Sequence, residues 1–284
     1  MQDKKSRIAA LIAVAVVAGW VMVGADQAPV QMPLEPVRER GASVTGAFEG
    51  WYKTPDGGFS ILVGYFNRNR AEALDIPVGP NNRIEPGGPD MGQPTYFLPR
   101  RQWGVFSIDV PKDFGTKRLT WTIVANGETT SIPLSLNPQY EVEPYKEAGM
   151  GNTPPTLKFS PSGPLVTGPP RGIAQTLTTT VAEPATLTFW AADESKADPA
   201  AQGRGRGGPP VTVSLAKHRG PGTVTFGAVR PTIDFKDGGR ASTTAKFSAP
   251  GDYIVRVQAN DSSGEGGGGF QCCWTNAHVK VTVK

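Results

Sequence analysis

Apolar and polar residues alternate in short runs along most of this 284-residue chain. Successive side chains of a β-strand point to opposite faces of a sheet, so a period of two predicts strands with one buried face. Between residues 43 and 136, the alternating sets are Ile61, Val63 and Tyr65; Phe106, Ile108 and Val110; Leu119, Trp121, Ile123 and Ala125; and Ile132, Leu134 and Leu136. Together they predict a first β-sandwich.

A second group of alternating runs occupies residues 153–284. Its members are Leu187 and Phe189; Val211, Val213 and Leu215; Val224 and Phe226; Ala245 and Phe247; Tyr253, Val255, Val257 and Ala259; and Val279, Val281 and Val283. Six runs suffice for two packed sheets, and helical periodicity is not sustained anywhere after residue 25. The sequence therefore predicts an all-β chain with two β-sandwich domains, at 43–136 and 153–284, joined by a proline-containing linker at 137–152.

Turn residues predict how some of these strands pair. Asn126-Gly127 supplies the positive φ angles of a tight hairpin, and residues 55–58 (Pro-Asp-Gly-Gly) predict another hairpin between strands near Trp51 and Phe59. Pro133 cannot donate to a strand ladder, so its strand is expected at a sheet edge. The 35 glycines and 27 prolines of the chain fit many short strands joined by turns.

Several segments of the second half carry a family resemblance. They are Gly220-Pro221-Gly222 with Val224 and Phe226, Thr243-Thr244-Ala245 with Phe247, and Ala249-Pro250-Gly251 with Tyr253 and Asp261. Residues 152–284 resemble the PKD-like and related immunoglobulin-like modules of secreted and surface-attached bacterial proteins. The resemblance implies an immunoglobulin-like sandwich that acts as a spacer or adhesion element. An Arg/Gly insertion at 193–210 and the glycines at 266–269 depart from it. We expect the Tyr253 hydroxyl to bond the backbone of the preceding corner.

The N-terminus has the composition of an export signal. Lys4, Lys5 and Arg7 precede an apolar run over residues 8–23, and small residues end at Ala25. We expect a signal peptide at 1–25, cleaved after Ala25, then an extended leader at 26–42, and a periplasmic, extracellular or cell-surface location. An uncleaved membrane anchor is the alternative, and it would be the chain's contact with a membrane.

Cleavage after Ala25 would lower the formal net charge from +4 to +2, because three basic residues and Asp3 leave with the segment. Phosphate-backbone binding needs a concentrated positive surface, so nucleic acid is not an expected partner.

The candidate binding residues lie beside a long connection between Pro77 and Pro99 that is rich in glycine, proline and asparagine. Long connections without strands are often functional. An exposed patch is predicted there, and the alternative is that its rings belong to the core. The residues are Tyr96, Phe97, Arg100, Arg101 and Trp103.

Cys272 and Cys273 are adjacent and are the two cysteines of the chain. They are candidates for a vicinal disulfide, which needs a break in a strand; an intermolecular bridge and free thiols are the alternatives. A soft-metal site formed by Cys272, Cys273 and His278 is a further hypothesis. His278 lies on the opposite parity from the valines around it, so we expect it to face solvent.

Motifs of catalysis are missing. The chain has two histidines, at 218 and 278, and lacks a Gly-x-Ser-x-Gly elbow, an HExxH pair and a phosphate-binding glycine loop. Calcium bound by loop carboxylates is a further hypothesis, at Asp193, Glu194, Asp198, Asp261 and Glu265. The sequence favours an exported, non-enzymatic interaction or structural protein of the cell envelope, with an unidentified protein or glycan partner. The alternatives are a metal-binding protein and a carbohydrate-contacting accessory module.

Overall fold

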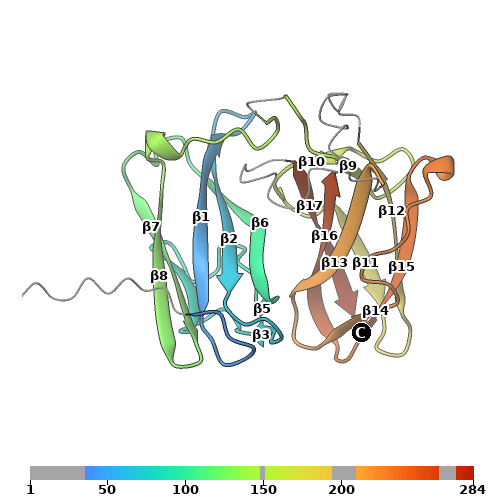
Figure 1. The fold of residues 1–284 in the computed structure, drawn as a ribbon, viewed down its shortest axis with the longest axis horizontal. Coiled ribbons are helices and arrows are strands. Elements are labelled where there is room, and N and C mark those ends of the chain that lie inside the picture. Colours follow the sequence, from blue (N-terminus) through green and yellow to red (C-terminus); the bar gives the residue numbers. More distant parts are fainter. Residues whose placement is uncertain (1–35, 148–150, 194–208, 262–272) are drawn as a thin grey trace, which may run out of the picture. The chain divides into compact units, whose positions relative to one another are not determined.

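The computed structural model describes residues 36–147, 151–193, 209–261 and 273–284. Within these ranges the chain is built from β-strands and two short 3-10 helices, which confirms the all-β prediction (Figure 1). The strands form two groups of sheets, one from residues 44–135 and one from residues 156–283.

The first sandwich has two three-stranded antiparallel sheets, in the orders β1-β2-β6 and β4-β7-β8, and a small sheet of β3 and β5. Its strands are β1 (Val44–Lys53), β2 (Phe59–Asn67), β3 (Leu74–Asp75), β4 (Asn82–Glu85), β5 (Tyr96–Phe97), β6 (Arg100–Val110), β7 (Arg118–Ala125) and β8 (Glu128–Ser135). Most of the alternating residues predicted for this half, with Phe97 and Ile84, belong to its buried core, and Ile132 and Leu136 pack against that core partly buried.

The second sandwich packs a five-stranded sheet, β10-β9-β12-β15-β14, against a four-stranded sheet, β11-β17-β16-β13. Strands β11 and β17 run parallel, and the other pairs are antiparallel. The strands are β9 (Thr156–Lys158), β10 (Val166–Thr167), β11 (Gln175–Thr179), β12 (Ala185–Ala192), β13 (Val211–Arg219), β14 (Val224–Phe226), β15 (Arg240–Phe247), β16 (Gly251–Asp261) and β17 (Trp274–Val283).

The local turn predictions are confirmed. β7 pairs with β8 across Asn126-Gly127, and β1 pairs with β2 across residues 54–58. β8, which carries Pro133, lies at a sheet edge. The hydroxyl of Tyr253 donates to the carbonyl of Ala249 at 2.8 Å, so the corner bond expected at the start of β16 is also present.

The connection from Pro77 to Pro99 contains strands, so the expectation of a strandless loop is wrong. β4 pairs with β7, and β5 pairs with β3. Their lengths of four and two residues, between glycines and prolines, hide the alternation by which longer strands are recognised.

The segment after β8 lies against the first sandwich. A 3-10 helix, η1 (Pro138–Tyr140), follows β8. The indole of Trp51 donates to the carbonyl of Asn137, and the Trp51 carbonyl accepts from the amide of Val142, both at 2.8 Å. The residues between the sandwiches therefore pack on β1.

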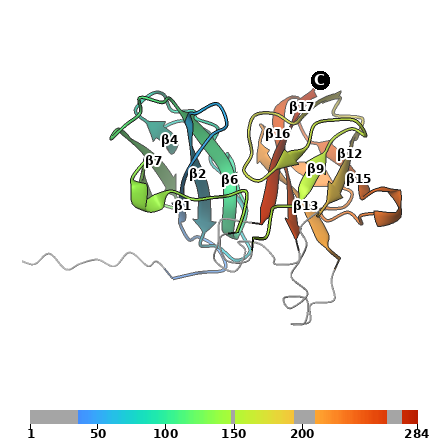
Figure 2. The ribbon, with the colours of Figure 1, turned by 90° about the horizontal axis from the view of Figure 1, so that it is seen from above.

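Residues 36–284 form one compact unit, in which the sheet β1-β2-β6 faces the sheet β11-β17-β16-β13. Figure 2 shows β6 beside β16 from a second direction. The predicted signal peptide, residues 26–35 of the leader, residues 194–208 of the Arg/Gly insertion and Cys272 lie outside the described residues. In the described part, no helix is long and apolar enough to cross a membrane.

Candidate functional site

Side chains on the outer face of β17 bind the backbone of β6. The Nδ2 amide of Asn276 donates to the carbonyls of Trp103 and Gly104, at 3.2 and 2.9 Å. Two residues further along β17, Nε2 of His278 donates to the carbonyl of Val105 at 3.2 Å. Because these bonds end on main-chain oxygens, they fix the register between the two facing strands.

Trp274 closes one end of this junction. Its side chain is buried and packs with Tyr52 and Leu62 in an apolar cluster between the sandwiches. Gly104 has φ +49°, and a Cβ atom there would lie 1.8 Å from Cη2 of the Trp274 ring. Position 104 therefore requires glycine for two reasons: a Cβ atom would overlap the Trp274 ring, and the positive φ angle would strain a residue with a side chain.

The buried carboxylate of Glu49, in β1, stabilises β6 within the first sandwich. Oε1 of Glu49 accepts from Nη2 of Arg101 at 2.5 Å, and Oε2 accepts from the amide of Gly104 at 2.7 Å. Burial raises the pKa of Glu49, while the charge and hydrogen bond of Arg101 oppose that rise. The same guanidinium lies 3.8 Å from the centroid of the Trp103 ring. Glu49 thus orders both the backbone and the side chains of β6.

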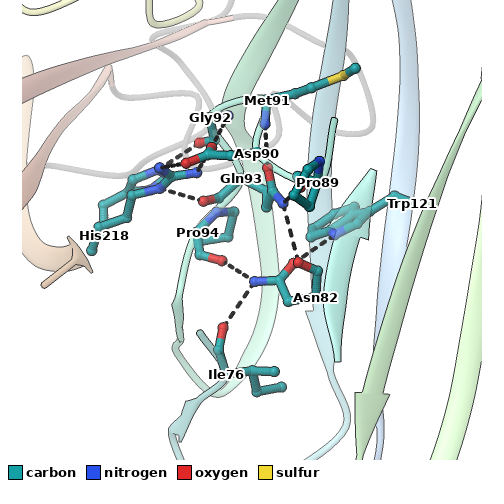
Figure 3. Close-up of polar contacts among 11 residues, drawn as sticks. Ile76, Asn82, Pro89, Asp90, Met91, Gly92, Gln93, Pro94, Trp121 and His218 are labelled. Atoms are coloured by element: carbon teal, nitrogen blue, oxygen red, sulfur yellow. Dashed lines mark hydrogen bonds and ion pairs between the residues drawn. The ribbon is translucent and has the colours of Figure 1, made fainter. Parts of the chain in front are cut away.

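The segment after β4 makes the second contact between the sandwiches. Arg219 of β13 donates through Nε to the carbonyl of Gln93 at 2.6 Å and through both terminal nitrogens to Asp90, at 2.7 and 3.0 Å. The amide of Thr95 donates to the carbonyl of His218 at 3.0 Å. Nε2 of His218 donates to the carbonyl of Gly92, also at 3.0 Å (Figure 3).

The side chain of Asn82 fixes the conformation of this segment through hydrogen bonds. This buried side chain donates to the carbonyls of Ile76 and Pro94, at 2.9 and 2.8 Å, and accepts from the indole of Trp121 at 3.0 Å (Figure 3). The side chain of Gln93 bonds the carbonyl of Pro89 and the amide of Met91. The segment therefore rests on the first core and presents fixed carbonyls to β13.

The two histidines of the chain meet inside the junction. The ring centroids of His218 and His278 lie 4.3 Å apart. Burial lowers the pKa of His278 to about 4, helped by the positive charges of Arg256 and Arg219. Burial also lowers the pKa of His218, and the neighbouring His278 adds to that shift. Both rings are therefore neutral near pH 7.

A cavity of about 780 Å³ opens beside this junction. Tyr96, Leu98 and Gln102 line it from the first sandwich. The lining residues of the second sandwich come from β13 (211–217), from β14 and the segment that follows it (224, 226, 229–233 and 235), and from β16 (256, 258 and 260), with Pro209 and Thr223. Ligand sites form preferentially at such boundaries, so this cavity is the candidate site.

The predicted binding residues lie in different environments and do not form one exposed patch. Phe97 lies in the first core with 0% exposure, so its predicted exposure is wrong; its ring stacks near Trp121, which fills the same core. Tyr96 lines the cavity. Arg100 is exposed with φ +68° at the start of β6, while Arg101 and Trp103 form the stacked pair behind the junction. Their role in binding stays a prediction.

The expectation that His278 faces solvent is wrong. Its parity does place it on the outer face of β17, but the first sandwich covers that face. Cys273 is 1% exposed, and its predicted disulfide partner Cys272 lies outside the described residues. The disulfide, the metal site that adds His278 to the pair, and calcium binding all stay predictions. Within the described residues, no three His, Cys, Asp or Glu side chains cluster as a metal site would require.

Sequence reasoning missed Glu49, Asn276 and Arg219, which hold the junction. One signal was available. Gly104 interrupts a run that otherwise reads as a strand, and glycine inside a strand marks close approach of another group. Polar residues opposite the core face of a strand look the same in sequence whether water or a second sandwich covers them.

No protein-family model matches the chain, and no curated protein matches it. Among solved structures, it is similar to the D00-D0 domain of intimin, with 12% identity over 89% of this chain and 96% of that chain, and a TM-score of 0.28. It is also similar to S-layer protein SbsC domains 4 and 5, with 12% identity over 85% of this chain and 98% of that chain, and a TM-score of 0.23.

Proposed function

We propose that this chain is an exported, non-enzymatic interaction module of the cell envelope that binds a partner in the cavity beside the sandwich junction. The observation that carries the proposal is that both sandwiches line the cavity while a network of buried bonds fixes them against each other. A site that is preorganised in this way loses little conformational freedom when its partner binds.

The positions of the ionisable groups support a binding role over a catalytic one. His218 and His278 each donate to a backbone carbonyl, and the carboxylate of Glu49 accepts from Arg101 and from the amide of Gly104. The histidine bonds join the two sandwiches, and the Glu49 bonds join β1 to β6 within the first sandwich. A general base instead needs access to a substrate proton.

Site-specific cross-linking in intact cells tests this function. A photoreactive amino acid replaces Ser214, which lines the cavity, and the matched control replaces Thr186, which is exposed on β12. We expect a covalent adduct with an envelope component from position 214 and none from position 186. Adducts from both positions alike, or from neither, would contradict the proposed site.

Cell fractionation and intact mass test the export part of the proposal. We expect the protein in the envelope or the medium, with a mass that corresponds to cleavage after Ala25. Unprocessed protein in the cytoplasm would contradict it.

A further inference from the structure

One wall of the cavity is a strand at the edge of its sheet. β13 pairs with β16 on one side and is the last strand in the order β11-β17-β16-β13. Every residue from Val211 to Lys217 lines the cavity. At the usual rise per residue, that length of strand spans roughly 20 Å. The cavity therefore follows the strand and is not confined to one of its ends.

The backbone of β13 offers hydrogen bonds to this cavity. The amide of Leu215 points away from β16, because it donates to the carbonyl of Val229 at 2.9 Å. Residues of the same parity in an antiparallel strand direct their amide and carbonyl groups to the same side. Val211 and Val213 share that parity, and within the described residues neither has a backbone partner on this side.

The two sides of the cavity differ in polarity. On the side of the sheet β10-β9-β12-β15-β14, apolar side chains line it, namely Val224, Phe226, Ile233 and Phe235. On the side of the first sandwich, the outward residues Ser214, Gln258 and Asn260 supply hydroxyl and amide groups. An added strand would place alternate side chains toward these two sides, so it would alternate apolar and polar residues.

The charges that line the cavity have one sign. Lys217, Arg230 and Arg256 are its charged lining residues, and none of the described lining residues carries a carboxylate. Lys217 is already paired with Asp75 at 2.7 Å, whereas Arg230 is exposed at the rim. A ligand with a carboxylate near Arg230 would match this field.

We propose that an extended segment of a partner protein binds in the cavity as an additional strand on β13, with alternating apolar and polar side chains and an acidic residue opposite Arg230. The inference rests on the proposed function, since it names the partner class for the same cavity. A polypeptide fits because its amides and carbonyls repeat at the spacing of the backbone groups that Val211 and Val213 present at this edge, next to the existing bond between Leu215 and Val229, and main-chain bonds there would give affinity.

Synthetic peptides titrated into the full chain test this inference. The probe is a heptapeptide of alternating valine and threonine with a glutamate at each end. Two matched versions carry N-methyl groups on alternate residues, one set on odd positions and the other on even positions. Because only one edge of the added strand faces β13, one version should bind like the parent and the other should bind at least tenfold more weakly.

Two protein variants locate the site and its charge. Ser214→Tyr fills the cavity and should abolish binding, whereas Thr186→Tyr, on an exposed position of β12, should leave it unchanged. Arg230→Glu should weaken binding of the glutamate peptide and strengthen binding of a version with lysine at both ends. Amide resonances of Val211 and Val213 should shift on titration, because both face the added strand.

Equal affinity of the two methylated versions would overturn the strand-addition proposal, as would a lack of binding by every peptide at millimolar concentration. If an oligosaccharide binds and Ser214→Tyr blocks it while the peptides stay inactive, this inference fails but the cavity remains a binding site. If position 214 also gives no adduct in cells, the proposed function fails as well.

Discussion

At the scale of single residues, the contact between β6 and β17 depends on groups that are small or neutral. Gly104 leaves room for the ring of Trp274, and the neutral rings of His218 and His278 can lie beside Arg256 and each other. Burial would make a charge on either ring costly. Both features can be tested by changing one residue at a time.

We expect Gly104→Ala to destabilise the chain by about 2 kcal/mol or more, because the new methyl group would overlap the Trp274 ring and the backbone has positive φ. Urea denaturation measures the change. Gly127→Ala is the matched control: φ there is +83° and no atom lies within 4 Å of an added Cβ, so it should cost about 1 kcal/mol or less. Adding Trp274→Ala to Gly104→Ala should recover part of the loss, and strictly additive effects would contradict the contact.

The histidines should make stability fall as pH falls. The pKa of each is lower in the folded chain than the ordinary value of 6.5, so the unfolded chain takes up more protons between pH 6.5 and about 4. His278 alone can account for roughly 3 kcal/mol across that window. The raised pKa of Glu49 acts in the opposite direction.

Denaturation midpoints from pH 4 to 8 measure this effect, with His278→Gln as the variant. Glutamine can still donate to the Val105 carbonyl but does not titrate in this range. We expect the variant to lose a large part of the pH dependence below 6.5 while its stability at pH 8 changes less. Parallel pH profiles for the two proteins would contradict the assignment.

At the scale of elements, period-two alternation predicted the long strands and short-range turn chemistry predicted the hairpins. The Tyr253 corner was also predictable, since it needs a turn, a strand and a hydroxyl that lie close in sequence. The short strands β4 and β5 were missed because few residues carry their pattern. The burial of His278 was missed because parity gives a face of the sheet but does not tell what covers that face.

The corner of β16 gives a prediction at this scale. Tyr253→Phe removes a buried hydroxyl and leaves the carbonyl of Ala249 without its side-chain donor. We expect a loss of about 1 to 2 kcal/mol in the free energy of unfolding. Tyr140→Phe removes a hydroxyl from a ring that is 51% exposed and should change stability little. Equal effects of the two substitutions would contradict a role for the corner bond.

At the scale of the whole molecule, the two sandwiches should unfold together, since the buried contacts between β6 and β17 couple them. We expect one calorimetric transition for the unchanged chain. The double variant Trp274→Ala with Asn276→Ala should split it into two, whereas the exposed substitution Thr186→Ala should not. Two transitions in the unchanged chain would show that the contacts do not couple the sandwiches.

The position of β17 in the chain order has a consequence for biogenesis. This strand follows all other described strands, yet it lies between β11 and β16 and also supplies the side chains that grip β6. During synthesis or translocation, the surfaces of β6, β11 and β16 that contact β17 therefore stay uncovered until residues 274–283 emerge. We expect a chaperone to be needed most during that interval, and a chain cut short before β17 to be degraded rapidly.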